Sequence, residues 1–148
     1  MAEAEFVWIE GTGEGFEHAR AVRLAVFVEE QGFSEASEFD ETDNTALHII
    51  GLAGGQAVCT GRLFAEAAAP AGEYHIGRVA VLSSQRGQGL GLQMLWQLEA
   101  RARQLGAREM VLHSQADKAD FYRRAGYAAT GDVFLDEGCP HMAMRKSV

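Results

Sequence analysis

The sequence predicts a mixed α/β domain in which one partly antiparallel sheet of six to seven strands is flanked by about four helices. Apolar segments of strand length alternate with segments whose apolar residues recur at helical spacing, in the order β-α-β-β-β-α-β-α-β-β. Glycines stand where turns and helix ends are expected. The 148 residues, 47% apolar with only two prolines, are predicted to form a single domain over 1–148.

The first half of the chain contains a predicted helix between short strands. Ala19 and Val22 lie on the apolar stripe of this helix, and Gly32 ends it. Gly54 and Gly55, between two apolar segments, are typical of a hairpin turn. The elements expected here are strand 6–9, helix 16–31, and strands 47–52 and 57–64.

The second half contains a longer helix between two strands, followed by a short helix. Leu95, Leu98 and Ala102 step by three and four, so the longer helix buries one face. Gly106 ends this helix, and Gly126 closes the short one. The elements expected here are strand 74–82, a helix ending at 105, strand 109–113, helix 118–125, and strands around 134 and 142–144.

Acidic residues dominate one segment. The stretch 29–43 contains seven acidic residues and no basic one. Such a run is typical of a solvated loop, and the alternative is an acidic rim that attracts an amine. The net charge of −8 disfavours nucleic acid as a partner, because counterion release needs a basic face, and it suits a small cationic substrate. Arg62 and Arg78, on neighbouring strands, are predicted to form salt bridges.

The two cysteines indicate a reducing compartment. Cys59 lies in a strand-like segment and Cys139 in a loop, without the spacing of a metal site or a redox motif. The first residues are acidic, and we see no apolar stretch typical of a signal peptide or a membrane span. We therefore expect a cytoplasmic protein with no metal and no membrane partner, in which Cys59 is packed in the core.

The residues from Arg86 to Gly91 form the most informative motif. Three glycines at alternate positions follow an apolar strand and open a helix, where unpaired N–H groups and the helix dipole favour an anion such as pyrophosphate. The dinucleotide-binding pattern fails because Leu92 stands where its third glycine belongs. The P-loop pattern fails because no Gly-Lys-Ser/Thr occurs. A glycine-rich helix start without a ligand is the alternative.

The pattern Arg-x-x-Gly-x-Gly resembles the acyl-CoA loop of the GNAT acetyltransferase superfamily, and the likeness extends over residues 6–145. The resemblance implies a GNAT-like fold splayed at the central acyl-CoA strand, with acetyl-CoA as cosubstrate. It also implies that loop amides grip the pyrophosphate and that a strand end pairs with the pantetheine arm, with Gly77 as a place for a bulge. The residues implied in CoA binding are Val79, Ala80, Val81, Arg86, Gly87, Gln88, Gly89, Leu90, Gly91, Gln115 and Tyr122.

The segment from Phe121 to Tyr127 carries the second part of the resemblance. It is similar to the Phe-Tyr-x-x-x-Gly-Phe/Tyr segment of the superfamily, which implies that Tyr122 lies near the CoA sulfur as general acid. Gln115 stands seven residues earlier, where many members carry asparagine, and its amide can still bond to pantetheine. Core packing is the alternative role for the tyrosine.

The general base is less well defined by the sequence. Strand alternation puts His75 on one face with Val79 and Val81, and position 75 matches the place from which many members project a glutamate. A histidine also suits the role of a base, so His75 is the candidate, with a structural histidine as the alternative. The other candidates are His48, Asp43, His141, and a base acting through ordered water.

Together these residues predict transfer of an acetyl group from acetyl-CoA to a primary amine by direct attack in a ternary complex. The acceptor is expected to be a small-molecule or peptide amine, and a homodimer is left open. The segment 26–31, with Asp40 and Asp43, resembles a bacterial GNAT subgroup. Two other classes of function stay open: a catalytically silent CoA-binding regulatory module, and an interaction domain that docks through 29–43.

Overall fold

The computed structural model describes residues 3–148, which form one mixed eight-stranded sheet. The strand order is β1-β2-β3-β4-β5-β8-β6, and β7 pairs with β8 off this path. Only β4 and β5 pair in parallel among the described strands. The strands are β1 (Glu5–Glu10), β2 (Leu47–Ala53), β3 (Gln56–Phe64), β4 (Glu73–Val81), β5 (Glu109–Gln115), β6 (Ala128–Ala129), β7 (Phe134–Asp136) and β8 (Cys139–Ser147). The predicted fold class is confirmed, and the strand that the prediction lacked is β6, which has only two residues.

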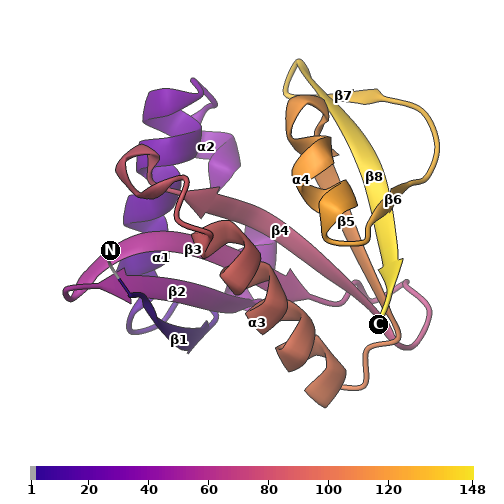
Figure 1. The fold of residues 1–148 in the computed structure, drawn as a ribbon, viewed down its shortest axis with the longest axis horizontal. Coiled ribbons are helices and arrows are strands. Elements are labelled where there is room, and N and C mark those ends of the chain that lie inside the picture. Colours follow the sequence, from indigo (N-terminus) through magenta and orange to yellow (C-terminus); the bar gives the residue numbers. More distant parts are fainter. Residues whose placement is uncertain (1–2) are drawn as a thin grey trace.

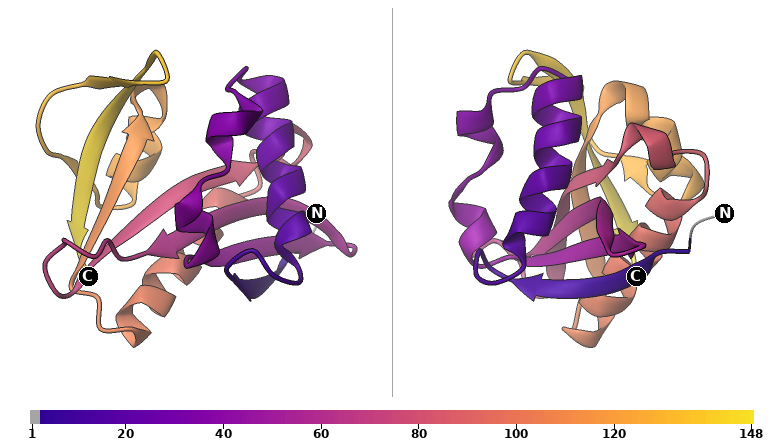
Figure 2. Two further views of the ribbon diagram at one scale, coloured as in Figure 1. Left: turned by 180° about the vertical axis from the view of Figure 1, so that it is seen from behind. Right: turned by 90° about the vertical axis from the view of Figure 1, so that its left-hand side faces the viewer.

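Helices cover both faces of this sheet. The α-helices among the described residues are α1 (Phe16–Arg23), α2 (Glu35–Glu38), α3 (Leu90–Gln104) and α4 (Ala119–Arg124). Helix α1 continues into a π-helical segment, η1 (Leu24–Glu30), in which the Gln31 amide bonds to the carbonyl five residues earlier, on Val26. Figure 2, right, shows α1 and η1 on one side of the sheet and α3 on the other. Two apolar cores result, one beneath α3 and one beneath α1.

Glycines set the turns that the sequence predicted. Gly54 and Gly55, with φ of +59° and +80°, form the two-residue connection between β2 and β3, because a hairpin of this length needs two left-handed residues. Gly106, with φ of +94°, ends α3. Both predictions are confirmed.

Strands β4 and β5 separate partway along their length. Their pairing runs from Glu73 opposite Glu109 to Ile76 opposite Leu112 and then stops. Strand β4 nevertheless continues for five residues, to Val81, and β5 continues to Gln115. Figure 1 shows the two strands diverging from the end of the sheet near the C-terminus into separate arms. The predicted splay at this strand is therefore present in the fold.

A β-bulge lies in β4 at the start of the separated part. The register with β3 shifts between Thr60 and Arg62, and Arg78 adopts a φ of +53°, which is rare for a residue with a side chain. The bulge is thus one residue beyond Gly77, where the sequence placed it. Because the extra residue reverses the alternation, the side chain of Ile76 packs in the same core as those of Val79 and Val81.

The bulge corrects one prediction about His75. Simple alternation put this histidine on the same face as Val79 and Val81. In the structure its neighbour Ile76 takes that face, so His75 lies on the opposite one. The physical reason is that one extra residue changes which side chains share a face.

Candidate active site

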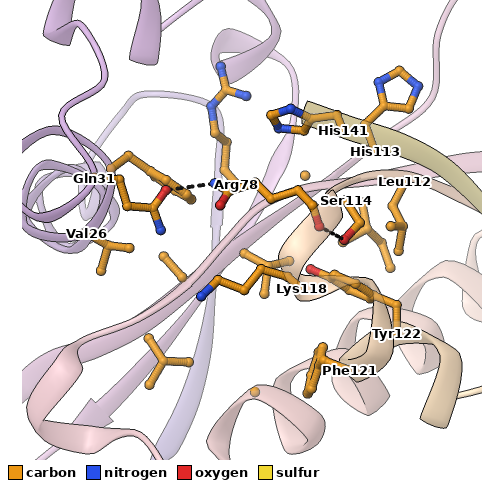
Figure 3. Close-up of a pocket in the computed structure, with 18 of the residues that line it drawn as sticks. Val26, Gln31, Arg78, Leu112, His113, Ser114, Lys118, Phe121, Tyr122 and His141 are labelled. Carbon is orange, nitrogen blue, oxygen red and sulfur yellow. Dashed lines mark hydrogen bonds between the residues drawn. The ribbon is translucent and has the colours of Figure 1, made fainter. Parts of the chain in front are cut away.

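A cavity of about 640 Å³ opens where β4 separates from β5. Its walls come from η1, the separated part of β4, the glycine loop, the end of β5, α4 and the turn before β8. Residues 77–81 keep β3 on one side and have no strand on the other. Apart from the Val81 carbonyl, which accepts a hydrogen bond from Arg86, their outward backbone N–H and C=O groups are therefore free to pair with an extended ligand. Figure 3 shows the side chains that surround this space.

The glycine loop forms one end of the cavity. Gly87 and Gly89 have φ of +83° and +81°, and Gly89 is the N-cap of α3. No side chain caps this helix, so the amides of its first turn are left for a ligand. A Cβ on Gly91 would lie 3.3 Å from Cζ of Phe121, which shows that the third glycine allows α3 and α4 to approach closely.

The side chain of Arg86 holds this loop against η1. Its guanidinium makes two hydrogen bonds of 2.7 Å to the carboxylate of Glu30, and its Nε donates to the carbonyl of Val81 at 3.0 Å. The ion pair lowers the pKa of Glu30 and keeps that carboxyl ionised. Arg86 therefore fixes where the glycine loop lies.

Gln115 bridges the open side of the splay. Its amide nitrogen donates to the Gln31 side-chain oxygen at 2.7 Å, which links the end of β5 to the end of η1 (Figure 3). The hydroxyl of Ser114 donates to the carbonyl of Gln115 at 2.8 Å and orients the strand end. Gln115 thus lies on the cavity wall opposite the free edge of β4, at Val79–Val81.

Tyr122 lies on the wall between α4 and β5. Its ring is half-buried and contacts Phe121 and Tyr127 edge-on, at centroid distances of 5.0 and 6.0 Å. Burial raises the pKa of the Tyr122 phenol well above its ordinary range, so the hydroxyl keeps its proton. The hydroxyl donates to no residue among 3–148, which leaves it available to a ligand.

The acidic segment 29–43 is only partly solvated: Glu29, Glu35 and Glu41 are exposed, as the solvated-loop interpretation predicted, whereas Glu38 and Asp43 are buried. Glu38 and Asp43 are 6% and 1% exposed because arginines from distant elements neutralise them. Arg23 donates to Glu38 at 2.8 Å and to Asp43 at 2.7 Å. The members of this group, called the Arg23 cluster below, are Arg23, Arg62, Arg78, Glu38, Asp40 and Asp43.

The Arg23 cluster also shapes the ionisation of its acids. Burial opposes the charge of Asp43, but the hydrogen bonds of Arg23 and Arg62 outweigh it and lower the pKa of that carboxyl. Burial prevails at Glu38 and raises its pKa, although Arg78 and Arg23 oppose the shift. Arg62 and Arg78 form salt bridges here, as the sequence predicted. The cluster fixes the segment that carries Glu38 against the cavity.

The histidines divide between the cavity and the core. His75 is not among the residues that line the cavity, because it stacks on Phe64 and its Nε2 lies 3.7 Å from a Glu73 oxygen. His48 is buried, and its Nε2 donates to the carbonyl of Asp43 at 3.0 Å. Only His113 and His141, of the described histidines, line the cavity.

His113 is a cavity residue that the sequence analysis did not name. It lies on β5 directly opposite Ala143, two residues before Gln115, and burial lowers the pKa of its imidazole. Period-two alternation from Gln115 was the signal in the sequence that pointed to this position.

Three further features bear on the chemistry of the site. Cys59 is fully buried, and burial raises the pKa of its thiol to about 11, so it is a packing residue. Within residues 3–148, no three His, Cys, Asp or Glu side chains gather as a metal site. In the same range, no helix combines the length and apolar character needed to cross a bilayer.

A splayed sheet with an uncapped glycine loop at the next helix defines the class of acyl-CoA-dependent acyltransferases. The family model for the acetyltransferase (GNAT) domain matches residues 13–148. The chain belongs to this family.

Relatives of this chain are similar along most of its length. It is 34% identical over 134 residues to YjcF of Bacillus subtilis, described as an N-acetyltransferase, covering 90% of this chain and 93% of that one. It is 35% identical over 133 residues to YyaT of the same organism, covering 88% and 87%. A solved acyl-CoA N-acyltransferase from Pseudomonas aeruginosa superposes with a TM-score of 0.81 at 28% identity, covering 97% and 99%.

Proposed function

We propose that this chain transfers an acetyl group from acetyl-CoA to a primary amine by direct attack in a ternary complex in the cytoplasm. The observation that carries the proposal is the separation of β4 from β5, which opens one cavity onto the glycine loop, a free strand edge and Tyr122. Proteins of this family transfer an acyl group from acyl-CoA. The proposal adds that the acyl group is acetyl and that the acceptor is a primary amine.

Acyl-CoA is proposed to lie along the cavity from the glycine loop to the point where β4 and β5 meet. The first-turn amides of α3 would bind the pyrophosphate, and the free edge at Val79–Val81 would pair with the pantetheine arm. Gln115 would exchange its hydrogen bond with Gln31 for one to pantetheine. This arrangement directs the thioester toward Tyr122.

The chemistry that these residues supply is positioning followed by stabilisation of the leaving sulfur. The neutral amine attacks the thioester carbonyl, the C–N bond forms and the C–S bond breaks. The Tyr122 hydroxyl, which keeps its proton because burial raises its pKa, donates to the departing thiolate. Backbone amides of β4 are the donors available to the thioester oxygen.

Release of free thiol from acetyl-CoA tests the proposal, with polyamines, aminoglycosides, amino acids and peptides offered as acceptors. We expect turnover with at least one amine class and none without an acceptor. Binding of acetyl-CoA in calorimetry without turnover on the whole panel would support the regulatory module instead. Absence of any thermal shift with acetyl-CoA would support an interaction domain that docks through segment 29–43, where Glu29 and Glu41 are exposed.

A further inference from the structure

Two histidines face the part of the cavity that the CoA-binding residues do not occupy. His141 lies on β8 and His113 on the adjacent strand β5. Figure 3 shows the His141 ring extending from β8 toward Arg78, on the side of the cavity away from Phe121. His141 is only 9% exposed, so what remains of its surface faces this cavity.

The hydrogen bonding of His141 fixes which ring nitrogen carries the proton. Its Nδ1 lies 2.8 Å from the carbonyl oxygen of Cys139. A carbonyl oxygen only accepts hydrogen bonds, so Nδ1 must be the donor, and the neutral ring then has its lone pair on Nε2. Nε2 makes no hydrogen bond to any residue of 3–148. The ring also stacks on Phe134, with centroids 6.1 Å apart.

Charged groups around the ring suit a cationic amine. Asp136 and Glu137, from the turn between β7 and β8, line the same cavity. From β4, Arg78 also faces it, but its charge is balanced by Glu38 at 3.0 Å and by Asp40 at 3.3 Å. From β5, the pKa of His113 is lowered by burial, which keeps that ring largely neutral.

We propose that Nε2 of His141 is the general base that removes a proton from the acceptor ammonium. This inference rests on the proposed function and deepens it. The ammonium gives one proton to Nε2, and its nitrogen then holds the electron pair that forms the C–N bond to the acetyl carbon. As the C–S bond breaks, the sulfur receives a proton through Tyr122, and the second proton lost from nitrogen replaces it on the phenol. The imidazolium of His141 returns its proton to solvent.

The same role fits His75 less well. His75 lies on the face of β4 opposite Val79 and Val81 and does not line the cavity. Its ring stacks on Phe64 and faces Glu73, both outside the cavity wall. A base must come within hydrogen-bonding reach of the amine that it deprotonates, either directly or through one water. His141 lines the cavity with its Nε2 unbonded, so an amine that enters there has access to it.

His141→Asn provides the test, because an asparagine amide can still donate to the Cys139 carbonyl in place of Nδ1 but has no basic nitrogen. We expect kcat/KM for the amine to fall about 100-fold, within the usual range for loss of a general base. Acetyl-CoA affinity should stay within about twofold, and the fall in wild-type kcat/KM below neutral pH should disappear. An unchanged pH profile and rate in His141→Asn would overturn the proposal.

The matched controls are His113→Asn and His75→Asn. His113 lines the same cavity from the neighbouring strand, so its replacement shows whether any cavity histidine sets the pH profile, and we expect the wild-type profile to be retained. His75→Asn should also retain it. Loss of the acid limb in His75→Asn alone would assign the base to His75 and refute the role of His141.

A second measurement tests the role of His141 without requiring that the proposed function be correct. If the wild-type chain turns over no amine, the ¹⁵N chemical shifts of His141 in the acetyl-CoA complex still report its tautomer. We expect the proton on Nδ1 and a bare Nε2. A proton found on Nε2 would contradict the proposal whether or not an acceptor is known.

Discussion

Backbone groups line one end of the cavity, and side chains line the other. The end at the glycine loop consists of backbone: a free strand edge and the uncapped first turn of α3, all within residues 77–91. The other end consists of side chains brought together from α2, β4, β5 and β8. Backbone amides suit a group common to the whole family, whereas side chains determine which acceptor enters. We therefore expect the proposed donor site to be shared with the family and the proposed acceptor site to be specific to this chain.

The largest expected effect lies beneath the acceptor end, in the Arg23 cluster. Replacing Arg23 by methionine leaves the buried Glu38 with Arg78 alone and the buried Asp43 with Arg62 alone, and the cluster then has one negative charge in excess. We expect the free energy of unfolding to fall by about 3–5 kcal/mol, because an uncompensated buried charge is costly. Urea denaturation followed by circular dichroism measures the change.

Arg20→Met is the matched control on the same helix. Arg20 also pairs with a glutamate, Glu35, at 3.0 Å, but both side chains are about half exposed. An exposed ion pair contributes at most about 1 kcal/mol, so this variant should unfold near the wild-type midpoint. Equal losses in the two variants would show that the burial of the cluster does not decide its importance.

The next effect concerns the point where the two ends meet. Tyr122→Phe removes only the hydroxyl, and we expect kcat to fall about 100-fold with acetyl-CoA affinity nearly unchanged. Tyr127→Phe is the control, because its hydroxyl bonds to the buried Glu99 at 2.8 Å instead of facing the cavity. The control should lose stability but keep its turnover. Steady-state kinetics and calorimetry separate the two, and unchanged turnover in Tyr122→Phe would remove the tyrosine from the mechanism.

A smaller effect is expected at the glycine loop. Gly89→Val places a side chain at φ of +81° beside the proposed pyrophosphate site, and we expect acetyl-CoA affinity to fall about tenfold. Gly106→Val imposes a similar strain at φ of +94° outside the cavity. Both variants should lose about 1–2 kcal/mol of stability, and only Gly89→Val should bind acetyl-CoA more weakly in calorimetry. Full affinity in Gly89→Val would refute the pyrophosphate site.

The smallest effect is a pH dependence of stability from His48, next to the Arg23 cluster. Burial lowers the pKa of this histidine in the folded chain. The unfolded chain therefore takes up the proton first as pH falls through about 6.5, and folding loses stability. Between pH 7.5 and 5.5 we expect the wild type to lose roughly 1 kcal/mol more than His48→Gln, measured by urea denaturation. Parallel pH profiles would show that His48 carries no such linkage.

The glycine loop and the turns could be predicted from the sequence because their signals are local. Gly89 and Gly106 occupy left-handed positions at the ends of one helix, and Gly54 and Gly55 do so in one hairpin. Each of these conformations depends on a few neighbouring residues. The same locality explains why the strand before the loop was placed nearly to its bounds.

The acceptor end could not be predicted in the same way. Segment 29–43 contains no basic residue, and the arginines that pair with its buried Glu38 and Asp43 lie at 23, 62 and 78, on other elements. Contacts between distant elements decided this outcome, and a charge run in one sequence does not show them. The face of His75 was wrong because the bulge at Arg78 reverses the alternation, whereas the prediction counted straight through the bulge expected near Gly77.

A π-helix holds more residues per turn than an α-helix, and the π-helical segment Leu24–Glu30 forms part of the cavity wall. Shortening this stretch by one residue would let it tighten into an α-helix rather than break. Because a π-helical turn takes up more residues than an α-helical one, such a deletion would change the phase of the flanking residues little, and Gln31 and Glu30 would stay near Gln115 and Arg86. Helix α1 has no such slack. A deletion there would turn everything beyond it by about 100° and separate both pairs, so the π segment is where this helix tolerates a change of length.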